Sequence, residues 1–162
     1  MQSRIIHNNY SVIRIEPGMV DDTLPFIEPI LKRAVPYTAG FVSVRQMIDT
    51  MRQGARPWQV WLITDGARPV GGFLSTLERV GEELVFQFEI LAGIDAQGWI
   101  IPIIDKFEQY LALIYGVTQV RIVGREGWSR FLASKGYAPQ SFITAKKILP
   151  AIHSSNRLEA AP

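Results

Sequence analysis

Hydrophobic and polar residues first alternate near the N-terminus and then recur at helical spacing. Residues 10–15, YSVIRI, predict a strand that the Pro17–Gly18 pair ends. Asp21 and Asp22 are candidates for the N-cap of a following helix, which Pro29 is expected to kink or interrupt. The apolar positions that predict this helix are Leu24, Ile27, Ile30, Leu31 and Ala34.

A second helix is expected directly after the first. Ser43 and Gln46 have the spacing of a capping box, and Gly54 is the expected end of the helix. Its apolar stripe consists of Val44, Met47, Ile48 and Met51. Two helices therefore separate the first predicted strand from the next.

The middle of the chain changes character. Residues 58–93 are rich in aromatic and β-branched side chains, with turn signals at Asp65-Gly66 and around Gly81. This pattern predicts three consecutive antiparallel strands. On the last of them, alternation places Phe86, Phe88 and Ile90 on one face and Val85, Gln87, Glu89 and Leu91 on the other.

A long helix is predicted after Gly93, with Asp95 as its N-cap and Gly116 as its end. Its apolar positions are Ile100, Ile104, Phe107, Leu111 and Ile114. Pro102 is compatible with this helix only in the first turn. The chain has four tryptophans, and their large apolar side chains are expected to pack in the core: Trp58, Trp61, Trp99 and Trp128.

The last third of the chain predicts a strand over 117–123, a short helix over 127–135 and a final strand over 141–149. The expected order is β-α-α-β-β-β-α-β-α-β, an α/β (α+β) fold with a single mixed, mainly antiparallel sheet flanked by helices. Residues 1–150 are expected to form one domain, and residues 151–162 a polar C-terminal tail.

Composition narrows the class of protein. A chain of 162 residues with 48% hydrophobic content can form one well-cored domain. It has no apolar run long enough to span a bilayer and no secretory signal, so we expect a soluble, cytoplasmic protein. There are no cysteines, and the two histidines, His7 and His153, lie near the chain ends. These observations argue against a metal site, a cysteine nucleophile and a Ser-His-Asp triad.

The net charge of +2 does not indicate a nucleic-acid partner, because no dense basic run is present. A nucleic-acid binder would have to use scattered cations, namely Arg121, Arg125, Arg130, Lys146 and Lys147. No pattern of stacking aromatic residues accompanies them.

The order of elements, together with LVFQFEILAG, VTQVRIVGREGW and RFLASKGY, resembles the GCN5-related N-acetyltransferase (GNAT) superfamily across nearly the whole chain. More narrowly, RPWQVWLITDG and GREGWSRFLASKGY are similar to acetyltransferase-like proteins of bacteriophages and prophages. The superfamily resemblance implies acetyl transfer from acetyl-CoA to an amine. It also implies two strands that splay apart, here 88–92 and 120–123, with the cofactor in the gap.

The resemblance implies a set of cofactor-binding residues at this gap: Ile90, Leu91, Gly93, Gly98, Gly124 and Arg125. The chain departs from the superfamily pattern at the phosphate loop, AGIDAQGWI, which lacks a basic residue. The loop instead contains the bulky Trp99 and Asp95, whose carboxylate repels a pyrophosphate. Leu132 stands where the superfamily usually has a tyrosine acid. These departures predict weak acetyl-CoA binding and slow catalysis.

Glu89 is the candidate catalytic base, because a carboxylate beside the strand gap can take a proton from an amine directly or through water. The alternative for Glu89 is the role of a solvated or ion-paired strand residue. Arg125 likewise has structural alternatives, since it could pair with Glu126 or cap a neighbouring helix.

Three functional classes remain open on the sequence. The first is an acetyl-CoA-dependent N-acetyltransferase with degenerate motifs, without a metal. The second is a non-catalytic phage protein of the same fold that serves virion assembly or binds a host protein, in the host cytoplasm or the virion. The third is the nucleic-acid binder described above. Fold alone does not choose among them.

Overall fold

A six-stranded sheet forms the centre of the protein in the computed structural model, which describes residues 4–38, 41–54, 57–123 and 127–139. The strands are β1 (Arg4–His7), β2 (Tyr10–Ile15), β3 (Trp58–Asp65), β4 (Arg68–Val80), β5 (Glu83–Gly93) and β6 (Gln119–Ile122). They lie in chain order, and all neighbours are antiparallel except β5 and β6, which are parallel. The expected mixed, mainly antiparallel sheet is thus confirmed.

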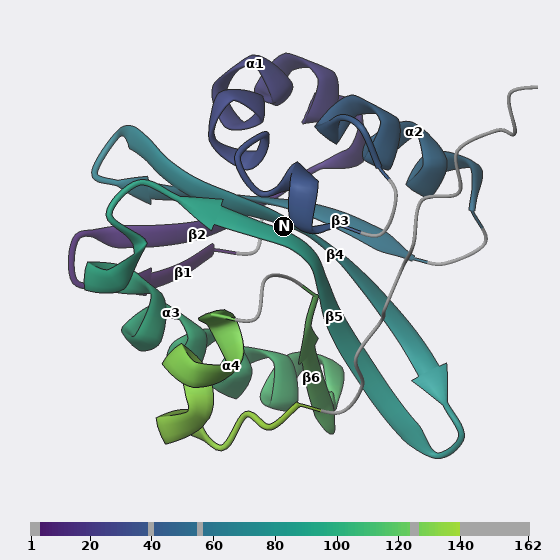
Figure 1. Ribbon diagram of the computed structural model, residues 1–162, viewed down its shortest axis with the longest axis vertical. Helices are drawn as coiled ribbons and strands as arrows, with labels where there is room; N and C mark the ends of the chain where they lie inside the picture. The colour runs from purple at the N-terminus through teal and green to yellow at the C-terminus, as the bar shows by residue number, and fades with distance from the viewer. Residues whose placement is uncertain (1–3, 39–40, 55–56, 124–126, 140–162) are drawn as a thin grey trace, which may run out of the picture.

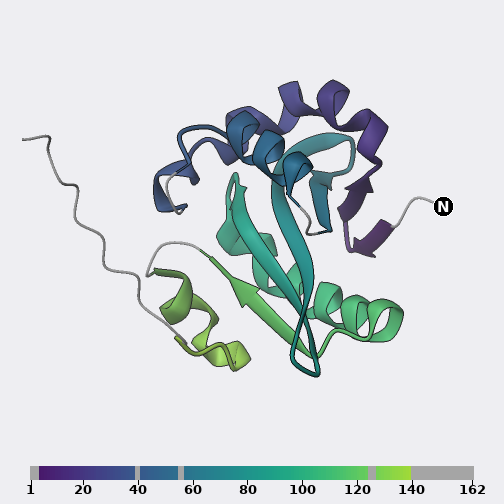
Figure 2. The same ribbon diagram turned by 90° about the vertical axis from the view of Figure 1, so that its right-hand side faces the viewer.

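Helices cover both faces of this sheet (Figures 1 and 2). One face carries α1 (Val20–Leu31) and α2 (Val44–Gln53), and the other carries α3 (Ala96–Tyr110) and α4 (Gly127–Leu132). Short turns complete the order: η1 (Pro17–Met19), η2 (Val35–Tyr37), the π-helical turn η3 (Leu111–Tyr115) and η4 (Ala133–Lys135). The predicted final strand over 141–149 and the polar tail lie outside the described residues.

Two hydrophobic clusters fill the spaces between the sheet and its helices. Between the sheet and α3, Trp61, Phe73, Phe86, Phe88 and Phe107 contact one another with ring centroids 4.8–5.9 Å apart. On the opposite face, the apolar side chains of α1 and α2 pack on Val60, Leu74 and Ile90. Trp61 and Trp99 are fully buried, as expected, whereas Trp58 and Trp128 are half-buried.

Strand β1 is an element that the sequence analysis did not predict. It pairs with β2 through a tight turn at Asn8 and Asn9, with His7 opposite Tyr10. Asn8 adopts a left-handed backbone, with φ of 53°, a conformation that asparagine tolerates better than most residues. Asparagine is common in turns because it tolerates this conformation, so the Asn-Asn pair was the local signal available for a turn here.

Helix α1 begins earlier than predicted and ends at Leu31, before Ala34, the last position of the predicted apolar stripe. Pro17 starts a 3₁₀ turn, so that Asp21 and Asp22 lie in the first turn of α1 rather than at its cap. Pro29 neither ends nor interrupts the helix, which continues to Leu31. Pro25 and Pro29 are four residues apart on the exposed face, where water can satisfy the carbonyl groups that they leave unpaired. The predicted cap of α2 is confirmed, since the Ser43 side chain accepts a hydrogen bond from the Gln46 N–H at 3.1 Å.

Helix α3 also departs from its prediction at three positions. Asp95 directly precedes the helix, but its backbone is left-handed, with φ of 50°, and its side chain makes no capping hydrogen bond. Pro102 lies in the second turn, and the carbonyl group that it leaves without a helical partner belongs to Gly98, an exposed residue. Ile114 is 63% exposed, although it fits the predicted apolar stripe. The wider π-helical turn from Leu111 to Tyr115 rotates Ile114 away from the core. Gly116 ends the helix with φ of 68°, as predicted.

Candidate functional site

The sheet forks between β5 and β6. The two strands pair from Val85 opposite Gln119 to Phe88 opposite Ile122, and the Val123 N–H donates to the Phe88 carbonyl at 2.9 Å. Beyond this point β5 continues to Gly93 and still pairs with β4. The other edge of β5 therefore has no paired strand from Ile90 to Gly93 in the described part of the chain. The predicted divergence of these strands is confirmed.

A slot of about 390 Å³ lies at this fork. Its residues come from four places: the connection after α1, the open edge of β5, the start of α3, and the β6–α4 region. They are Arg33, Ala34, Tyr37, Thr38, Ile90, Leu91, Ala92, Gly93, Ala96, Gln97, Ile100, Val123, Gly127, Trp128 and Phe131. The connection after α1 belongs to one helical layer, and α3 and α4 to the other (Figure 2). The slot is therefore bounded by both layers.

A β-bulge lies just before the open edge. Ser75 pairs with Phe88 and Leu74 pairs with Ile90, which leaves Glu89 as the extra residue on β5. The bulge resets the alternation of side chains, so Phe86 and Phe88 pack with Leu91 in the α3 cluster, whereas Ile90 packs in the α1–α2 cluster. The predicted shared face of Phe86, Phe88 and Ile90 is thus wrong.

The Glu89 side chain is half-buried and held by two donors. Thr76 Oγ1 donates to Glu89 Oε1 at 2.7 Å, and Gln87 Nε2 donates to the same oxygen at 2.9 Å. Oε2 has no hydrogen bond within the described part of the chain. Glu89 does not line the slot, but it directly precedes Ile90, the first β5 residue that does. One carboxylate oxygen is therefore oriented by the sheet and the other is open to a donor.

The slot unites half of the cofactor-binding residues that the resemblance implies. Ile90, Leu91 and Gly93 line it, whereas Gly98 is exposed in the first turn of α3 and is not among the described lining residues. Gly124 and Arg125 lie outside the described residues, as does the predicted direction of the Arg125 side chain.

Gly93 has a packing role that the sequence analysis did not foresee. A Cβ atom at Gly93 would lie 2.1 Å from Trp99 Cζ2, and one at Gly71 would lie 2.9 Å from the same ring. Trp99 Nε1 donates to the Ile94 carbonyl at 2.9 Å, which fixes the indole between these glycines. Trp99 therefore packs inward under the loop before α3 rather than standing in the slot.

Leu132, at the position of the superfamily's tyrosine, points into the core and is 1% exposed. The α4 side chains that line the slot are Trp128 and Phe131, which carry no acidic proton. A phenol nevertheless enters the slot from the opposite layer, because Tyr37 of η2 lines it. The neighbouring hydroxyl, that of Thr38, donates to the Val35 carbonyl at 2.6 Å.

Arg33 and Tyr37 are slot residues that sequence reasoning missed. They lie in the short connection RAVPYT, and nothing in its local pattern indicates that it approaches a strand more than fifty residues later. The one signal available is general: functional side chains concentrate on connections rather than in regular elements.

The segment after α4 is fastened to α3 by two polar contacts. Lys135 Nζ lies 2.6 Å from Asp105 Oδ2, and the Tyr137 hydroxyl donates to Glu108 Oε1 at 2.5 Å. Burial raises the pKa of Tyr137 well above its ordinary value, and the hydrogen bond to Glu108 and the charges of Glu108 and Asp105 raise it further. Tyr137 is therefore a neutral hydrogen-bond donor, which suits a structural contact.

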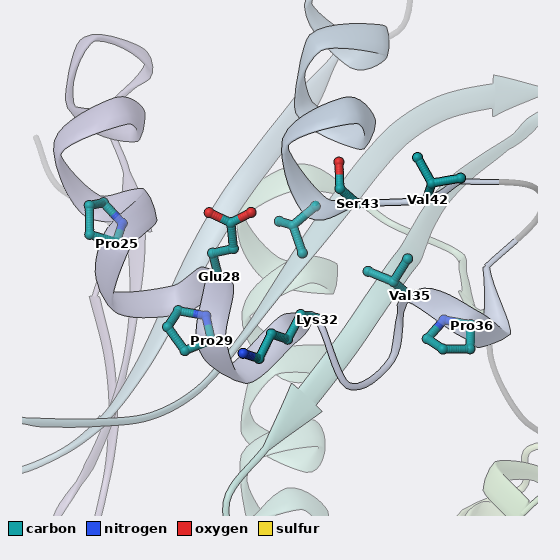
Figure 3. Close-up of a pocket in the computed structure, with 9 residues that line it drawn as sticks. Pro25, Glu28, Pro29, Lys32, Val35, Pro36, Val42 and Ser43 are labelled. Atoms are coloured by element: carbon teal, nitrogen blue, oxygen red, sulfur yellow. The ribbon is translucent and has the colours of Figure 1, made fainter.

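A second hollow, of about 500 Å³, lies between α1 and the start of α2 (Figure 3). Pro25, Glu28, Pro29 and Lys32 from α1 and its end face Val42 and Ser43 across it. The Ser43 hydroxyl already caps α2, and the hollow has no open strand edge. The slot at the fork is therefore the better candidate for a functional site.

Three further observations on the described residues concern metal sites, membrane spans and nucleic-acid binding. No group of three or more His, Cys, Asp or Glu side chains there could hold a metal ion. In the same residues, no helix is long and apolar enough to cross a membrane. Of the five cations considered for nucleic acid, the structure describes Arg121 and Arg130, and Arg121 Nε donates to Gln119 Oε1 at 2.7 Å.

No family model and no curated protein matches the sequence. Solved structures do match the fold. A possible acetyltransferase from Clostridium difficile has a TM-score of 0.59 at 7% identity, over 88% of this chain and 99% of that chain. An aminoglycoside acetyltransferase from an uncultured soil metagenomic sample has a TM-score of 0.59 at 16% identity, over 90% and 99%.

A GNAT-family acetyltransferase from Staphylococcus aureus has a TM-score of 0.57 at 6% identity, over 86% of this chain and 99% of that chain. AAC(6')-Iy, in complex with the bisubstrate analogue CoA-S-monomethyl-acetylneamine, has the same TM-score at 8% identity, over 86% of this chain and 98% of that chain. The chain therefore has the fold of GNAT acetyltransferases.

Proposed function

We propose that this protein is an acetyl-CoA-dependent N-acetyltransferase that acts on an amine. The observation that carries the proposal is the slot at the fork, where β5 leaves β6 and, among the described residues, has no paired strand beside its edge from Ile90 to Gly93. Structures that share the fold include acetyltransferases, one of them in complex with a CoA-containing analogue. The slot is where the fold resemblance implies acetyl-CoA binding.

The chemistry of the slot suits a chain that contains amide groups. An open strand edge offers backbone N–H and C=O groups at regular intervals, and an extended ligand can pair with them as an added strand. Apolar side chains, among them Ile100, Trp128 and Phe131, line the slot around this edge. Such a slot favours a long, thin ligand with alternating amide and methylene groups, which describes the pantetheine part of CoA.

Glu89 is proposed as the base. Acetyl-CoA supplies a thioester whose acyl carbon forms a C–N bond to the amine as the C–S bond breaks. The amine must lose a proton in this transfer, and Glu89 Oε2 is available to take it directly or through one water. Thr76 and Gln87 hold the other carboxylate oxygen and fix the orientation of Oε2.

The departures at the phosphate loop and at Leu132 remain arguments for a weak enzyme. Without a basic residue before α3, affinity for acetyl-CoA is expected to be below that of a protein with the complete loop. Without the α4 tyrosine, the departing thiolate must obtain its proton from another group. Tyr37 is the phenol that lines the slot in the described part of the chain.

The test is calorimetric titration of the full chain with acetyl-CoA, followed by thiol-release assays on a panel of amines. Glu89→Gln should bind acetyl-CoA as the wild type does and lose about a hundredfold or more in turnover, a typical contribution of a general base. Glu83→Gln is the matched control, because Glu83 is an exposed carboxylate at the far end of the same strand. Its turnover should equal that of the wild type.

Equal turnover of Glu89→Gln and wild type would remove Glu89 from the mechanism. Binding of acetyl-CoA without turnover on any amine would favour the non-catalytic alternative, a GNAT-fold protein that serves virion assembly or binds a host protein. That alternative and the narrower resemblance to bacteriophage and prophage proteins stay predictions from the sequence.

A further inference from the structure

Arg33 is the only charged residue among those that line the slot in the described part of the chain. The other described lining residues have apolar or uncharged polar side chains, and the open edge of β5 adds polar but neutral backbone groups. A single positive charge in an otherwise neutral slot attracts a ligand with a negative charge. Arg33 thus favours an anionic ligand in a slot whose other described side chains carry no charge.

The backbone of Arg33 is held in place by its surroundings. It follows α1 directly, and its N–H donates to the Ile30 carbonyl at 3.4 Å. Leu31 and Val35, on either side, are buried at 0% and 7% exposure in the α1–α2 cluster. The segment therefore presents the Arg33 side chain from a fixed base.

The guanidinium of Arg33 is also available. It has no ion pair and no side-chain hydrogen bond within the described residues. Several other cations there are paired, for instance Arg52 with Asp21 at 3.1 Å and Lys135 with Asp105 at 2.6 Å. An arginine without a carboxylate partner offers a fork of N–H donors that matches phosphate oxygens.

We propose that Arg33 is the anion-binding residue of the slot and that it recognises a phosphate group of CoA. The connection between α1 and α2 would thereby supply the positive charge that the loop before α3 lacks. The identity of the ligand as CoA rests on the proposed function. The charge at the slot rests on the structure alone.

Lys32 provides a matched control of equal charge. It is the neighbour of Arg33 in sequence and is likewise exposed, but it lines the hollow between α1 and α2 instead of the slot (Figure 3). A general electrostatic attraction would respond equally to removal of either cation. A specific contact responds only to removal of Arg33.

The experiment compares wild type, Arg33→Gln and Lys32→Gln by calorimetry with CoA, dephospho-CoA, pantetheine and inorganic pyrophosphate, at low and high salt. At low salt Arg33→Gln should bind CoA about tenfold more weakly, a typical loss for a charge-assisted contact that is partly exposed. Pantetheine carries no phosphate, so its affinity should not change. The tenfold difference should shrink at high salt, because salt screens exposed charges.

Dephospho-CoA identifies the phosphate. If the arginine meets the 3′-phosphate, Arg33→Gln should lose affinity for CoA alone; if it meets the pyrophosphate, the loss should extend to dephospho-CoA. Either result supports the proposal, provided that Lys32→Gln binds as the wild type does and that melting temperatures agree. Equal CoA affinity of Arg33→Gln and wild type, or an equal loss in both variants, overturns it.

The failure of the proposed function gives a different result. If the wild type binds inorganic pyrophosphate in an Arg33-dependent way but does not bind CoA, the anion site stands and the acetyl-CoA assignment falls. If the wild type binds none of the four compounds, both are overturned.

Discussion

Gly93 and Gly98 look alike in the sequence, as two glycines that flank the start of a helix, yet the structure gives them different surroundings. Gly93 faces the Trp99 indole, whereas a Cβ atom at Gly98 would meet nothing within 4 Å. Gly93 is needed because a larger residue would overlap the indole. Gly98 is not required by packing, and as a glycine inside a helix it loses more backbone entropy on folding than another residue would.

Alanine substitutions should therefore change stability in opposite directions. Gly93→Ala should lower the free energy of unfolding by about 1–3 kcal/mol, because the new Cβ overlaps a buried ring. Gly98→Ala should raise it by roughly 0.5–1 kcal/mol, because alanine favours the helix more than glycine does. Urea denaturation of the two variants measures both effects. Destabilisation by Gly98→Ala would contradict the open surroundings, and weakened CoA binding in a stable Gly98→Ala would support a cofactor role for Gly98.

At the scale of elements, the fork depends on how the chain after β6 is attached. The short helix α4 and η4 lie against α3, and Lys135 and Tyr137 fasten the end of this unit to Asp105 and Glu108. Trp128 and Phe131 of α4 line the slot, so these contacts help to hold one of its walls. The raised pKa of Tyr137 makes this attachment sensitive to alkaline pH.

Tyr137→Phe should lower the free energy of unfolding by about 1 kcal/mol at pH 7, since it removes one hydrogen bond to a carboxylate. The native state raises the pKa of Tyr137, so the unfolded chain loses this proton first as the pH rises. The contribution of Tyr137 is thus fully present below about pH 10 and declines above it. Urea denaturation from pH 7 to 11 should show the two proteins converging; a constant difference would mean that the phenol does not titrate as inferred.

On the scale of the whole molecule, the slot brings together residues from the two helical layers, which lie on opposite faces of the sheet. Arg33 and Tyr37 come from the α1–α2 layer, and Trp128 and Phe131 from the α3–α4 layer (Figures 1 and 2). A ligand in the slot contacts both layers at once. Binding should therefore stabilise segments that are far apart in the sequence.

Hydrogen exchange with and without CoA tests this expectation. Protection should increase in residues 31–38, at the start of α3 and in α4, because a ligand that binds only the native state suppresses local opening at its site. The β1–β2 hairpin, which contributes no residue to the slot, is the internal control. Protection confined to the hollow between α1 and α2 would place the ligand there instead.

Much of this arrangement was determined by the sequence itself. Alternation and helical spacing predicted β2 to β6 and all four helices, and the Ser43 cap and the Gly116 end were identified from single residues. These features depend on neighbours within a few positions along the chain, where backbone conformation and side-chain type are directly linked. The resemblance on LVFQFEILAG and RFLASKGY likewise placed the fork between the correct strands.

The composition of the slot was decided only by the tertiary structure. The bulge at Glu89 depends on the register of β4 against β5, and that register moves Ile90 to the other face of the sheet. Arg33 and Tyr37 reach the slot because α1 and η2 pack across β5, a contact between residues more than fifty positions apart. Local sequence carries no record of such contacts, since they follow from how the layers pack on the sheet. The place of the site could thus be predicted from the sequence. That Arg33 would line it, as the only charged side chain among the described lining residues, could not.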